Sequence, residues 1–170
     1  MSPDPVLDEL NGLDRAGFAG RLGAVAEGSP WVAEAAWAKR PFADRDALAA
    51  AFGRAIEEAP AERQLALIRA HPELADRAAI AGARGADSAR EQASAGLDAL
   101  SEEEHARLIG LAAAYRARFG FPFVMVVRGR TPAAITAALE RRLRDDPDTE
   151  REVALREVER IVELRLEALA

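Results

Sequence analysis

The residue of this chain best suited to chemistry is His71, one of two histidines in a sequence that has no cysteine. It directly precedes Pro72. A residue before proline is pushed out of the α region, so one helix should end near Ala70 and leave His71 at an exposed junction. Pro72 suits the first turn of a short second helix that runs to about Ile80.

The two helix ends act on this histidine in opposite directions. The C-terminus of the first favours imidazolium, and the N-terminus of the second favours the neutral ring. A histidine balanced in this way suits proton transfer at roughly neutral pH. The spacing equally allows a capping or surface histidine without a chemical role, and both interpretations stay open.

A polar group follows in the run Ser88-Ala89-Arg90-Glu91-Gln92. Ser88 and Glu91 have the spacing of a capping box, in which a serine caps a helix and a glutamate three residues later bonds back to the cap. Gln92 is not needed for a cap, and its amide offers a donor and an acceptor to a ligand with several amide groups. The run therefore predicts either a helix cap or part of a binding site.

The run Phe121 to Val127 is apolar and has the composition of a strand. No second strand is predicted to pair with it, so we interpret it as a buried segment that is either extended or helical. Four arginines surround it and either attract an anion or form a solvated face: Arg116, Arg118, Arg128 and Arg130.

Helical periodicity dominates the rest of the chain. Predicted helices cover residues 6–27 with an interruption near Gly12, residues 44–58 and residues 61–70. Others follow a capping box at 101–104, Thr131-Pro132 and Asp146-Pro147. A short helix after Ser29-Pro30 is flanked by Trp31 and Trp37 as core anchors, and residues 82–86 form a loop. We predict an all-α fold: a single compact bundle of about seven to nine helices, one domain over residues 1–170.

Composition excludes several classes of function. The net charge of -6 disfavours nucleic acid, because phosphate neutralisation needs a basic surface. The longest strongly apolar run is too short to span a bilayer, and the acidic N-terminus lacks the organisation of a signal peptide. We therefore expect a cytoplasmic protein without a membrane partner. The absence of cysteine and the shortage of histidine predict no metal site.

Several motifs together resemble the family of OHCU decarboxylases, where OHCU is 2-oxo-4-hydroxy-4-carboxy-5-ureidoimidazoline. The resemblance extends over almost the whole chain, in the family's order and approximate spacing. It is carried by Ser29-Pro30-Trp31-Val32, Arg40-Pro41-Phe42, the run Leu67 to Ala75, the run Ser88 to Leu97, the run Phe119 to Val124, and Leu164-Arg165-Leu166.

The resemblance implies an all-helical, cofactor-free homodimer that acts on a small-molecule ureide and forms (S)-allantoin in the last step of urate degradation. It makes His71 the catalytic proton donor and Glu91 a second catalytic residue that orients the substrate. The implied substrate-binding residues are Pro72, Ser88, Ala89, Arg90, Glu91, Gln92, Phe123, Val124, Met125, Val126 and Val127, the last five largely through backbone groups.

Two functions of other classes remain open. One is a non-catalytic helical module that binds a ureide or regulates a partner, and the other is a structural domain in which His71 and the run 88–92 are helix caps. The presence of both His71 and Glu91 favours the enzyme.

Overall fold

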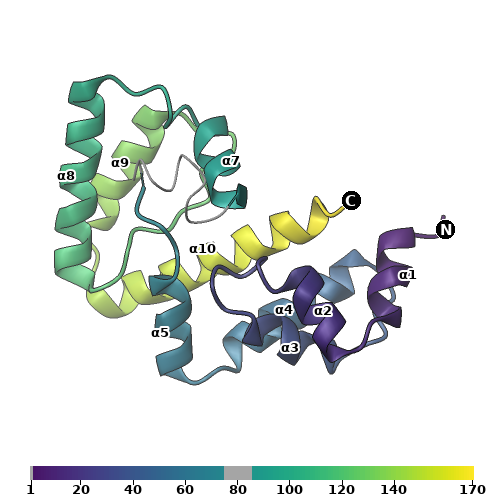
Figure 1. Ribbon diagram of the computed structural model, residues 1–170. Coiled ribbons are helices and arrows are strands. Elements are labelled where there is room, and N and C mark those ends of the chain that lie inside the picture. The colour runs from purple at the N-terminus through teal and green to yellow at the C-terminus, as the bar shows by residue number, and fades with distance from the viewer. Residues whose placement is uncertain (1, 75–85) are drawn as a thin grey trace. The chain divides into compact units, whose positions relative to one another are not determined.

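The computed structural model describes residues 2–74 and 86–170. Within these two ranges the chain forms nine α-helices and no strand, which confirms the predicted all-α class and helix number (Figure 1). No helix in the described ranges is long and apolar enough to cross a membrane. The helices are α1 (Pro5–Gly12), α2 (Arg15–Leu22), α3 (Trp31–Trp37), α4 (Arg45–Glu57), α5 (Ala61–Arg69), α7 (Ala86–Ser94), α8 (Glu102–Phe119), α9 (Pro132–Arg142) and α10 (Pro147–Glu167).

The chain divides into two compact units. One consists of Met1–Ala70 and Val158–Ala170, and the other of His71–Glu157. Helix α10 begins in the second unit and ends in the first. That residues 1–170 act as one domain stays a prediction.

Three helices of the first unit, α1, α2 and α4, begin with aspartate caps. Asp4, Asp14 and Asp44 each accept hydrogen bonds from backbone N–H groups in the first turn of the helix that follows. Such caps satisfy donors that a helix cannot satisfy itself. The fully buried ring of Phe18 packs against Phe42 and Phe52 in the core.

The second unit contains every residue predicted for the site. Its longest complete helix, α8, begins with the predicted capping box: Glu104 N donates to Ser101 Oγ at 3.1 Å, and Ser101 N donates to Glu104 Oε1 at 3.2 Å. It ends at Gly120, whose φ of 79° is the left-handed conformation that glycine adopts without strain. Helix α9 begins as predicted, with Thr131 as cap and Pro132 in the first turn.

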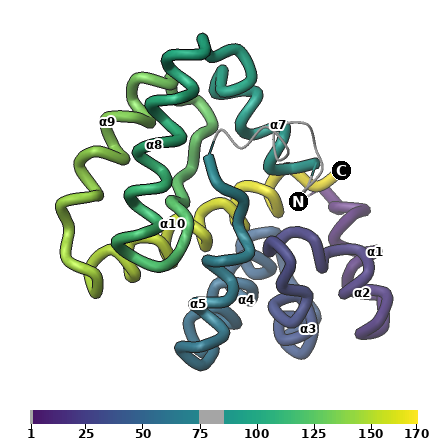
Figure 2. Tube along the Cα trace, turned by 60° about the vertical axis from the view of Figure 1, so that its left-hand side comes forward, coloured from purple at the N-terminus to yellow at the C-terminus, as the bar shows by residue number. Residues whose placement is uncertain are grey.

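The connection between α8 and α9 is extended. The two helices lie side by side and run in the same direction, and the connection returns alongside them (Figure 2). The connection passes along the helices without forming a helix itself, and no helix or turn is assigned within residues 122–127. The structure thus decides between the two conformations that the sequence left open for this run.

Some expectations are wrong or lie outside the described residues. Trp31 and Trp37 are only half-buried, and their rings lie against Arg63 and Arg40 instead of anchoring the core. Pro72 to Leu74 form no helix, and residues 75–80 of the predicted short helix lie outside the described residues. The same holds for residues 82–85 of the predicted loop, whereas residue 86 already begins α7.

Candidate functional site

His71 lies immediately after α5, which ends at Arg69 with Ala70 as its C-cap. The helix therefore ends where the proline rule predicted. The expectation of an exposed junction is wrong, because His71 is only 7% exposed and its Nε2 atom is buried. A histidine withdrawn from bulk solvent can transfer a proton to a bound molecule without competition from water.

Helix α7 carries the predicted polar group on its inner face. Ser88 and Gln92, four residues apart, are buried at 6% and 4% exposure, and Glu91 beside them is half-buried. Residues three and four apart share one face of a helix, so these three side chains point to the same side. Ala89 is half-buried, whereas Arg90 is exposed and forms an ion pair with Asp87 on the outer side.

The capping-box interpretation of Ser88 and Glu91 is wrong. An N-cap residue precedes the first helical residue, but α7 begins at Ala86 and Ser88 is its third residue. The burial of Ser88 and Gln92 therefore does not follow from capping. These residues are polar side chains on the buried face of the helix, where a purely structural helix would place apolar ones.

The run Phe123 to Val127 is buried, as predicted, with only Val126 half-buried. Two helices provide the hydrogen-bond partners that a neighbouring strand would otherwise supply. Arg142 Nη1, at the end of α9, donates to the carbonyl oxygen of Val124 at 2.7 Å. The N–H of Val126 donates to Glu157 Oε2 on α10 at 3.0 Å.

Arg142 belongs to a buried polar cluster with Tyr115 and Glu150. Arg142 Nε donates to Glu150 Oε1 at 2.6 Å, and the Tyr115 hydroxyl donates to the same oxygen. The guanidinium also lies 4.4 Å from the centre of the Phe123 ring. Arg142 is 5% exposed, Glu150 and Tyr115 are fully buried, and the three therefore hold one another in a fixed geometry.

This environment changes the acidity of the cluster. Burial raises the pKa of the Tyr115 phenol well above its ordinary value, and the hydrogen bond to Glu150 raises it further. Burial also raises the pKa of the Glu150 carboxyl, while its hydrogen bonds with Tyr115 and Arg142 lower it. Tyr115 is therefore a protonated hydrogen-bond donor throughout the physiological range.

The sequence contains a signal for this cluster. Arg142 lies four residues after Ala138 and three after Leu139 on the buried face of α9. Glu150 lies four residues before Ala154, the first buried apolar residue along α10. A charged residue that continues an apolar stripe indicates a buried charge with a partner.

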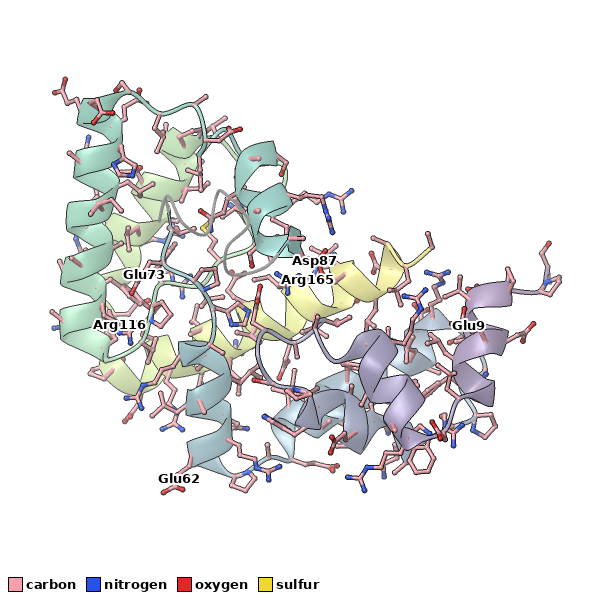
Figure 3. All side chains as sticks on the ribbon, in the orientation of Figure 1. Glu9, Glu62, Glu73, Asp87, Arg116 and Arg165 are labelled. Atoms are coloured by element: carbon pink, nitrogen blue, oxygen red, sulfur yellow. The ribbon has the colours of Figure 1, made fainter. Side chains whose placement is uncertain are left out.

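Glu73 forms an ion pair with an arginine of α8. Its Oε1 accepts a hydrogen bond from Arg116 Nη1 of α8 at 3.1 Å, and Figure 3 shows the two side chains close together. Arg118, another of the four arginines around the run Phe121 to Val127, donates to the carbonyl oxygen of Asp145 at 2.8 Å. Both arginines thus have local partners.

Comparison with known proteins identifies one family. The family described as OHCU decarboxylase matches residues 11–167. The 2-oxo-4-hydroxy-4-carboxy-5-ureidoimidazoline decarboxylase of Haloferax volcanii is 48% identical over 94% of this chain and 93% of its own length. The protein of that name from Bos taurus is 42% identical over 94% of both chains.

Solved structures show the same fold. A crystal structure of (S)-allantoin synthase superposes with a TM-score of 0.76 and 30% identity over 95% of this chain. This chain spans only 52% of that longer protein. A crystal structure of OHCU decarboxylase in the presence of (S)-allantoin superposes with a TM-score of 0.70 and 25% identity, covering 86% of this chain and 94% of the other.

Proposed function

This chain belongs to the OHCU decarboxylase family, whose members are carboxy-lyases, and we propose that it converts OHCU to (S)-allantoin with His71 as the proton donor. The observation that carries the assignment of the donor is the buried His71 directly after α5. It belongs to the same compact unit as the polar face of α7 and the run 123–127.

The substrate brings its own electron sink. One carbon carries a hydroxyl and a carboxylate and is next to a C=N bond. When the bond to the carboxylate breaks, carbon dioxide leaves and the electron pair passes into the neighbouring C=N. The enol intermediate then takes one proton on the carbon that bears the ureido group. Delivery to one face of the ring gives a single enantiomer, while the hydroxyl proton passes to the ring nitrogen and the ring C=O of (S)-allantoin forms. A protonated imidazole fixed on one side supplies the proton to carbon.

The apolar run assists the first step. A carboxylate held among Phe123, Val124 and neighbouring apolar side chains is poorly solvated, and its charge disperses as carbon dioxide forms. We assign the substrate contacts to Pro72, to the backbone and side chains of residues 88–92, and to the backbone of residues 123–127. Glu91 orients the substrate's hydroxyl or its ureido N–H groups, so that the proton reaches the correct face.

The exposed side chain of Arg90 limits how this residue could contact the substrate. Because it points to solvent and is paired with Asp87, its contribution to a ligand would come through its backbone. Ser88 and Gln92, in contrast, are buried on the inner face and can contribute side-chain hydroxyl and amide groups. The homodimer and the cytoplasmic location stay predictions.

The test is direct. Added to freshly generated OHCU, the protein should accelerate loss of the circular dichroism signal of OHCU and yield (S)-allantoin. His71→Asn keeps a polar side chain but cannot donate a proton to carbon, so it should abolish turnover while the far-ultraviolet spectrum is retained. Turnover by His71→Asn at the wild-type rate would overturn the role of His71. Allantoin binding without turnover by the wild type would instead indicate the non-catalytic module.

A further inference from the structure

The run 123–127 has two sides, and the structure shows which of them is occupied. In extended backbone the N–H and C=O of one residue point to the same side, and those of the next residue point to the opposite side. Val124 and Val126 are two residues apart, so the Val124 carbonyl and the Val126 N–H share one side. These are the two groups bound by Arg142 and Glu157.

The backbone N–H and C=O groups of Phe123 and Met125 point to the opposite side of the run. The N–H and C=O of Met125 point together away from the two charged side chains, as the groups of a strand residue do toward a neighbouring strand. A ureide offers a carbonyl beside an N–H and can therefore pair with both groups at once. The carbonyl of Val127 is used differently, because it accepts from the N–H of Arg130 in the following turn at 3.0 Å.

The two charged side chains differ in how firmly they are held. Arg142 is fixed by Glu150 and by the Phe123 ring, and the loss of its charge would leave the buried Glu150 without its cationic partner. Glu157 is half-buried and meets the run only through the Val126 N–H. Substitution of Glu157 therefore perturbs the run without disrupting the buried cluster.

We propose that Arg142 and Glu157 are positioning residues for ureide binding: they hold the Val124 and Val126 side of the run, so that the backbone of Met125 faces the ligand. This inference rests on the proposed function, which assigns the run to the substrate site. The proposed function assigns all five residues of the run 123–127 to the ligand. The positioning argument selects Met125 among them, because the Val124 carbonyl and the Val126 N–H are already bound to Arg142 and Glu157.

The first experiment compares three variants on α10. Glu157→Ala removes the acceptor for Val126, Glu157→Gln restores an acceptor oxygen, and Glu152→Ala is the matched control because Glu152 is exposed and pairs only locally with Arg156. Loss of one positioning contact should raise the KM for OHCU and the Kd for (S)-allantoin about tenfold. The value of kcat should change much less. Glu157→Gln should recover most of the affinity, and the control should match the wild type.

The second experiment measures hydrogen exchange of the backbone amides in the run 123–127. Saturating (S)-allantoin should slow amide hydrogen exchange at Met125 in the wild type, and the Glu157→Ala variant should show less of this protection. At Val126 allantoin should change little, because that N–H is already donated to Glu157. Protection at Val126 without protection at Met125 would overturn the proposal. A Glu157→Ala variant that loses thermal stability but keeps the wild-type KM and Kd would also overturn it.

The two proposals fail in distinguishable ways. A wild-type protein that does not consume OHCU contradicts the proposed function, whereas the exchange pattern on allantoin tests the positioning without turnover. Normal turnover together with unchanged affinity in both Glu157 variants contradicts the positioning alone.

Discussion

The buried Tyr115 should titrate at a higher pH than an ordinary tyrosine, and its signal can be assigned without ambiguity because it is the only tyrosine in the chain. Its hydroxyl is buried and donates to Glu150 Oε1, and burial followed by this hydrogen bond raises the pKa of the phenol. The folded protein should therefore show no tyrosinate absorbance as the pH passes through 10, the ordinary range for tyrosine. The absorbance should appear only when the protein unfolds.

The size of the effect on stability follows from proton linkage. With its folded pKa raised, Tyr115 contributes stability that is fully present below the unfolded pKa of about 10 and is lost as the pH rises above it, because the unfolded chain releases a proton that the folded chain keeps. Between pH 9 and pH 11 the free energy of unfolding should fall by about 1.4 kcal/mol from this group alone. There is no cysteine and Lys39 is the only lysine, so few other side chains titrate there.

The assay pairs the wild type with Tyr115→Phe. The variant loses a hydrogen bond to a charged acceptor, so at neutral pH it should be less stable by about 1.5–3 kcal/mol in urea denaturation. That difference should shrink by about 1.4 kcal/mol between pH 9 and pH 11, because only the wild type has a tyrosine whose deprotonation in the unfolded state lowers the free energy of unfolding. Tyrosinate absorbance with a midpoint near pH 10 in a protein that keeps its native circular dichroism would refute the reasoning.

Two further predictions concern catalysis. Glu91→Gln exchanges two side chains of similar size and helix propensity, so the free energy of unfolding should change by no more than about 0.5 kcal/mol, whereas kcat for OHCU should fall; an unchanged rate together with a lower melting temperature would assign Glu91 a structural role. Dialysis against a chelator should leave the rate unchanged, since two histidines and no cysteine provide few ligands for a tight transition-metal site; a loss that zinc or manganese restores would contradict this.

The helices could be predicted because their signals are local. The capping box at Ser101 and the cap at Thr131 each depend on side chains and backbone within one turn. The same kind of signal was misleading at Ser88. A serine and a glutamate three residues apart do not specify where the helix begins, and the structure begins α7 at Ala86. Two capping boxes with the same spacing thus had different outcomes.

The burial of charge could not be predicted in the same way, because it depends on residues far apart in the sequence. Glu150 meets Tyr115 across 35 positions, and Glu157 meets Val126 across 31. Tyr115 lies three residues after Ala112 on the buried face of α8, but this spacing does not identify the group that accepts the hydrogen bond from its hydroxyl. The burial of His71 could not be predicted for a related reason. Junctions between helices are often exposed, and tertiary packing decides whether a given junction is buried.

An extended run in an all-helical fold needs partners for its backbone, and this need connects the fold to the proposed chemistry. A central strand of a sheet would have both sides occupied by neighbouring strands, and its backbone groups would not be available to a ligand. Here side chains from α9 and α10 take one side, through Arg142 on Val124 and Glu157 on Val126. Because these partners are side chains, no strand in the described part of the protein pairs with the other side of the run 123–127. A fold of this kind can therefore offer a small ureide the hydrogen bonds that a sheet would keep for itself.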